Sequence, residues 1–135
     1  MAFTGNYTCN SFKSGLIDGD FDFDTDTFKI ALYTNSASLN AETAAYTATG
    51  EVSGSGYTAG GNTLPVSKGI TGGTAYITFA DTSWSAALTA RGALIYKDGG
   101  AAVCVLDFGS DKTSTTTFTV DFPVASSTDA LIRLS

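Results

Sequence analysis

Residues 92–108 read Gly-Ala-Leu-Ile-Tyr-Lys-Asp-Gly-Gly-Ala-Ala-Val-Cys-Val-Leu-Asp-Phe and give the clearest indication of the fold class. Two apolar runs flank Lys97-Asp-Gly-Gly100, and Asp-Gly and Gly-Gly supply the positive-φ positions of a tight hairpin turn. Both runs are apolar at odd and even positions, which is typical of strands that are covered on both faces. We therefore predict two central antiparallel strands, over 90–97 and 101–108.

Other segments show strand patterns separated by Gly, Asp and Ser. In Thr117-Phe-Thr-Val-Asp-Phe122 the aromatic and aliphatic residues alternate with threonines, which predicts one buried face and one solvated face. No segment of helical length lies between the strands from Thr63 onward. The sequence therefore predicts an all-β chain, an antiparallel β-sandwich or small barrel of about six to eight strands. The further expected strands are 63–68, 74–80, 115–122 and 129–134.

The 135 residues fit a single domain that begins with an arm and a short helix. We expect residues 1–10 to form an N-terminal arm that orders against a neighbour. Residues 11–19 are expected to form a helix that ends at Gly19, and residues 20–135 the β-sandwich. A long polar loop over 34–62 interrupts the sandwich, with one helical turn expected over 41–46.

A second alternation lies before the first long strand. Asp20-Phe-Asp-Phe-Asp24 has period two, and the following Phe28, Ile30 and Leu32 alternate with the opposite parity. A change of parity would turn every side chain to the wrong face. The sequence therefore predicts two strand segments with a turn or bulge at Thr25-Asp26.

Charge limits the partners of this chain. The net charge is −6 and charged residues make up only 15% of the chain, so clustered cations for phosphate are lacking. We expect no nucleic acid partner and no membrane partner, because no apolar run approaches the length of a spanning helix. The N-terminal residues lack the pattern of a signal peptide, so we expect synthesis in a cytoplasm.

The chemistry of the side chains argues against catalysis. The chain has no histidine, which excludes Ser-His-Asp and Cys-His arrangements and any zinc site with a histidine ligand. Cys9 and Cys104 fit two buried free thiols, and a bridge between them is the less favoured alternative. Glu42 and Glu51 lie in the polar loop, where solvated carboxylates are expected. We expect no enzyme and no cofactor.

A run of aspartates, Asp18-Gly-Asp-Phe-Asp-Phe-Asp-Thr-Asp26, is the one cluster that suggests a metal. Calcium binds several oxygens, and Asp20, Asp22 and Asp24 match the start of an EF-hand loop. Thr25 stands where the motif requires Gly, and Ala31 where it requires Glu. Solvated or interface-facing aspartates are favoured, although a run curled into a loop at a subunit contact would offer calcium ligands between chains.

The loop Glu51-Val-Ser-Gly-Ser-Gly-Tyr-Thr-Ala-Gly-Gly61 combines glycines, hydroxyl residues and one aromatic. Glycines let the backbone turn tightly or approach another surface closely, so this composition indicates a role in assembly with other subunits. Whether Tyr57 faces a partner or its own core stays open at this level. Trp84 is interpreted as a core-edge residue with a bonded indole N–H, or else as an interface anchor or sugar platform. The candidates for contact with other subunits are Phe3, Tyr46, Tyr57, Gly60, Gly61 and Trp84.

Several stretches resemble a family of small structural proteins of tailed-bacteriophage particles. They are residues 26–39, 43–61 with the Gly-Tyr-Thr-Ala-Gly-Gly motif, the segment around Trp84, 90–96 and 105–112. The resemblance implies a non-enzymatic virion protein, and the role expected here is a capsid decoration or cement protein. The alternatives are a tail or fibre-associated subunit and, from another class, a carbohydrate-binding adhesion module that uses Trp84, Tyr46 and Tyr57.

The resemblance also implies partners and a location. We expect the major capsid protein or other virion subunits as partners. Copies of this chain are expected to form a closed homo-oligomer, with a trimer favoured at the three-fold positions of a shell. The protein would be located in the virion after synthesis in the host cytoplasm.

Overall fold

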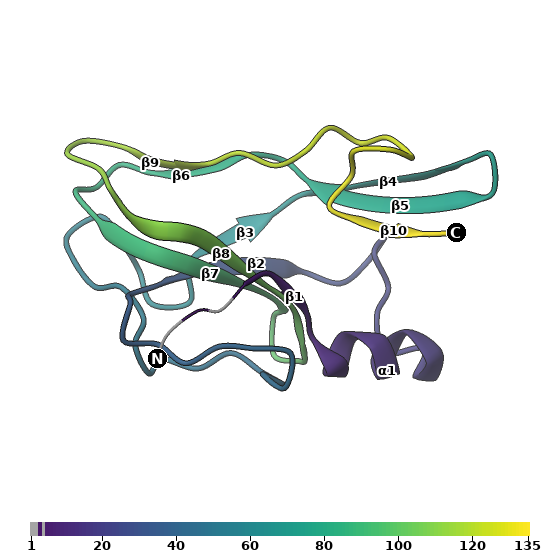
Figure 1. Cartoon of the computed structure of the whole chain (residues 1–135), viewed down its shortest axis with the longest axis horizontal. Coiled ribbons are helices and arrows are strands. Elements are labelled where there is room, and N and C mark those ends of the chain that lie inside the picture. Colours follow the sequence, from purple (N-terminus) through teal and green to yellow (C-terminus); the bar gives the residue numbers. More distant parts are fainter. Residues whose placement is uncertain (1–2, 4) are drawn as a thin grey trace.

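The chain is mainly β, with antiparallel sheets and one short helix (Figure 1). The computed structural model describes Phe3 and residues 5–135. Strands account for 42% of the structure and helix for 7%, so the predicted fold class is confirmed. The helix among the described residues is α1 (Asn10–Asp18), and it ends at Gly19 in the left-handed conformation, as predicted. The strands are β1 (Tyr7–Thr8), β2 (Phe28–Tyr33), β3 (Asn62–Leu64), β4 (Val66–Thr71), β5 (Thr74–Phe79), β6 (Thr82–Trp84), β7 (Thr89–Lys97), β8 (Ala102–Thr113), β9 (Phe118–Val120) and β10 (Ile132–Leu134).

One layer is a five-stranded sheet in the order β1-β8-β7-β2-β3. The hairpin between β7 and β8 forms as predicted: the N–H of Gly100 donates to the carbonyl of Lys97 at 2.8 Å, and Gly99 has φ +73°. Ala90 pairs with Lys112 and Gly92 with Asp107, so residues 108–111 bulge out opposite Arg91. This bulge lets β8 continue past the expected end at Phe108 and bend toward the second layer.

Both faces of this sheet are buried, as expected for its central strands. In β2, Phe28, Ile30 and Leu32 point into one core, while Ala31 and Tyr33 point into a second core on the opposite face. The second core is closed by the first part of the loop 34–61 and by N-terminal residues, because Ala37, Leu39 and Phe3 belong to it, whereas Val52 and Tyr57 of the same loop belong to the first core. The polar loop is therefore a cover for the sheet, which its composition did not reveal.

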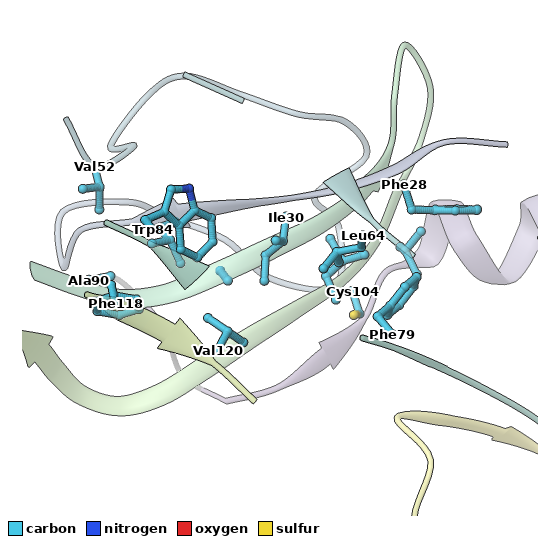
Figure 2. Packing of buried hydrophobic residues seen from close by; sticks show 14 of the residues in the cluster. Phe28, Ile30, Val52, Leu64, Phe79, Trp84, Ala90, Cys104, Phe118 and Val120 are labelled. Carbon is cyan, nitrogen blue, oxygen red and sulfur yellow. The ribbon is translucent and has the colours of Figure 1, made fainter. Parts of the chain in front are cut away.

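The other layer contains a three-stranded sheet, β10-β5-β4, and a two-stranded sheet, β6-β9. Figure 1 shows β6 and β9 above the five-stranded sheet, and β4, β5 and β10 to its upper right, above α1. Figure 2 shows Trp84, Phe118 and Val120 of this layer facing Ile30 and Ala90 of the other. These contacts form the main hydrophobic core of the sandwich.

A single proline carries the chain from one layer to the other. The strand predicted over 63–68 is two strands, because β3 pairs with β2 and β4 pairs with β5. Pro65 lies between them, and a proline has no N–H to contribute to a ladder. The prediction of one continuous strand was wrong for this reason.

Residues 20–22 have no regular structure and residues 23–25 form a turn, so the strand predicted over 20–24 is wrong. The carboxylate of Asp26 accepts the N–H of Asp22 at 2.8 Å, and the carboxylate of Asp22 accepts the N–H of Asp24 at 2.9 Å. Aspartates offer the backbone these local partners in place of a strand ladder. Phe21 and Phe23 stack with ring centroids 6.3 Å apart and close one end of the core. The predicted turn at Thr25-Asp26 is present.

Two other expectations need correction. Residues 41–46 form a turn, because the N–H of Thr43 donates to the carbonyl of Asn40, and Ala45 makes a β-bridge with Ala101 instead of a helical turn. The arm over 1–10 lies partly outside the described residues, at Met1, Ala2 and Thr4. Its described residues contact their own domain, where Phe3 is buried and β1 pairs with β8.

Candidate functional site

The glycine-rich loop is organised around the carboxylate of Glu51. Its Oε1 accepts a hydrogen bond from the Tyr46 hydroxyl at 2.5 Å. Its Oε2 accepts one from the Tyr57 hydroxyl at 2.6 Å and one from the N–H of Gly60 at 2.8 Å. Hydrogen bonds to an ionised acceptor are stronger than neutral ones. Glu51 is therefore a partly buried structural group, and the expectation of a solvated loop carboxylate was wrong.

Tyr57 faces its own core. Its side chain is only 9% exposed, and its ring lies 5.8 Å from that of Trp84. The pairing of β3 with β2 stops at Ile30, and the Tyr57 hydroxyl accepts the next free N–H on this edge, that of Leu32, at 2.9 Å. Tyr57 therefore packs within its own domain, where its hydroxyl bonds to the edge of β2.

Gly60 and Gly61 bring the loop backbone against the five-stranded sheet. Gly61 has φ +80°, and a Cβ there would lie 1.7 Å from the carbonyl oxygen of Ile30, so no other residue fits. Gly60 has φ +96°, and its carbonyl accepts the Tyr96 hydroxyl at 2.7 Å. Both glycines are explained by close approach within the chain.

The tyrosines of this cluster are held in their protonated form. Burial and the negative charge of Glu51 raise the pKa of Tyr96 to about 12. Burial and the hydrogen bond to Glu51 raise the pKa of Tyr46 to about 12 as well. The pKa of Tyr57 and that of Tyr33 are raised further, mainly by burial. These phenols act as hydrogen-bond donors, and the arrangement fixes the loop.

Trp84 and Phe3 are also packed within the domain. Trp84 is 4% exposed and lies between Tyr57 and Phe118, so its ring offers no face to a sugar. Its indole N–H was expected to reach a loop carbonyl, but among the described residues it has no hydrogen-bond partner. Phe3 packs against Gly92, where a Cβ would lie 2.6 Å from the ring. Tyr46 is half-buried and stacks on Tyr96.

The aspartate run does curl into a loop, but the carboxylates of Asp22, Asp24 and Asp26 are already bonded within the chain. The Asp24 carboxylate lies 3.0 Å from Lys68 Nζ, and that of Asp26 lies 3.1 Å from Lys97 Nζ. Hydrogen bonds from backbone N–H groups lower the pKa of Asp22 and that of Asp26. Asp20 is exposed. Within the described part of the chain, no three acidic or cysteine side chains converge as metal ligands would.

The two cysteines lie in different cores. Cys9 belongs to the core under the loop, and Cys104 belongs to the main core on the other face of the sheet. Both thiols are free, and burial raises the pKa of Cys9 to about 11 and that of Cys104 further. Neither thiol is placed to act as a nucleophile.

Two of the four exposed large apolar side chains of the described residues lie on the three-stranded sheet. Ile70 of β4 and Leu134 of β10 both pair with Ala75 of β5, so the three form one row on one face. Ile70 is 72% exposed and Leu134 is 51% exposed. The next row inward on this face contains Ile77 and Ile132, which pack on the main core.

The buried face of this sheet thus continues beyond the core as exposed surface. We call Ile70, Ala75 and Leu134 the apolar strip. Sequence reasoning missed it, because its three residues come from distant segments that meet only through strand pairing. The alternation in Val66-Ser-Lys-Gly-Ile70 was the one available signal.

Comparisons with known proteins add no relative. No protein-family model, no curated protein and no solved structure matches this chain. Among the described residues, no helix is long and apolar enough to cross a membrane.

Proposed function

We propose that this chain is a non-enzymatic structural subunit of a tailed-phage particle, a capsid decoration or cement protein located in the virion. The observation that carries the proposal is the apolar strip, because an apolar row continuous with the core is typical of a surface that binds protein. The sequence resemblance to phage virion proteins supports the same role. The partners would be the major capsid protein and other copies of this chain.

The interior of the domain suits a role that depends on rigidity. Both faces of the five-stranded sheet are buried. Glu51 holds Tyr57 and Gly60 of the long loop, which bond to Leu32 of β2 and Tyr96 of β7. A domain with a fixed loop loses little conformational freedom when it binds. Repeated at every equivalent position of a shell, a modest contact per subunit would oppose the outward pressure of packaged DNA.

The aromatic rings named for the carbohydrate-binding alternative are not free to stack on a sugar. Trp84 and Tyr57 are buried in the core, and the Tyr46 ring stacks on Tyr96. A tail or fibre-associated subunit would use the same apolar strip with another neighbour. The binding test below therefore includes isolated tails beside empty shells.

Binding to phage particles tests the proposal. Purified protein is mixed with empty shells and, separately, with isolated tails, and the bound copies are counted after sedimentation. We expect saturation on shells at a fixed copy number. Saturation on tails alone would replace the decoration role with the tail-associated one. Binding to neither, or binding to host glycans only, would overturn the proposal.

A matched pair of variants links this binding to the strip. Ile70→Asp places a charge in the strip, whereas Val124→Asp places one at another exposed apolar position, 66% exposed. Burial of one isoleucine contributes about 2 kcal/mol, so we expect Ile70→Asp to weaken shell binding by about tenfold or more. Val124→Asp should bind as the unchanged protein does.

A further inference from the structure

We draw no further inference here: the strongest candidate, the hollow between the long loop and the β7–β8 hairpin that Lys29, Tyr46, Gly60, Tyr96 and Asp98 line, carries nothing because a cation and a carboxylate share its wall and nothing in the structure shows what covers it.

Discussion

The hydroxyl of Tyr57 accepts a hydrogen bond from the N–H of Leu32, in the place where a neighbouring strand would supply a carbonyl. The Leu32 N–H donates to the Tyr57 hydroxyl at 2.9 Å, and that hydroxyl donates to Glu51 at 2.6 Å. On the same edge, the carbonyl of Leu32 accepts the N–H of Val52. A side chain and a loop thus complete the edge of β2 where β3 ends.

Removing this hydroxyl should destabilise the domain. Tyr57→Phe keeps the ring but leaves the buried N–H of Leu32 without its acceptor and removes one of the three donors to Glu51, which costs about 1–3 kcal/mol. Urea unfolding followed by tryptophan fluorescence measures the change. Tyr76→Phe is the control, because the Tyr76 ring packs over Gly69 and no hydrogen bond of its hydroxyl is formed within the described residues. Equal stability of Tyr57→Phe and the unchanged protein would contradict this role.

Gly61 should tolerate no side chain. Gly61→Ala adds left-handed strain of about 1–2 kcal/mol and overpacking of about 1–3 kcal/mol, because the Cβ meets the carbonyl of Ile30. Gly99→Ala is the matched control: φ is +73° there, but nothing lies within 4 Å of the added Cβ. Thermal unfolding should show a much larger loss for Gly61→Ala, and similar losses would show that the close approach is unimportant.

Stability should fall in alkali. The pKa values of Tyr46 and Tyr96 rise from 10 to about 12 in the folded state. Between these values the unfolded chain releases protons that the folded chain keeps, so the contribution of these two tyrosines to stability decreases as pH rises through this window and is constant below it. Unfolding by urea at a series of pH values, with tyrosinate absorbance, measures the slope. Tyr46→Phe should reduce the slope of stability against pH. An unchanged slope would contradict the raised pKa of Tyr46 beside Glu51.

Acid should weaken the bulge in β8. The Arg91 guanidinium, 3.0 Å from Asp107, together with the N–H of Gly109, holds the pKa of Asp107 below its ordinary value of 3.8. This carboxylate contributes stability above that value, and the contribution is lost as pH falls through the lower folded pKa. Asp107→Asn should therefore have a flatter acid branch of the stability curve than the unchanged protein. If the stability of Asp107→Asn and that of the unchanged protein fall equally steeply with decreasing pH, the Asp107 carboxylate does not contribute as described.

Local patterns predicted the parts of the fold that are held by local contacts. The hairpin over 92–108 follows from turn residues and apolar neighbours that lie next to each other in sequence. The run Asp20–Asp24 misled because alternation also arises where aspartates bond their own backbone. The carboxylate of Glu51 gathers Tyr46, Tyr57 and Gly60 through loop geometry that no periodicity encodes. The apolar strip was equally hidden, since Leu134 reaches Ala75 only through long-range pairing.

The corner at Pro65 has a mechanical consequence. Because this one residue separates β3 from β4, tension applied to the projecting sheet passes directly to the ladder between β3 and β2. A neighbour that pulls on β4 would therefore load β2, a strand of the main core, through a single residue.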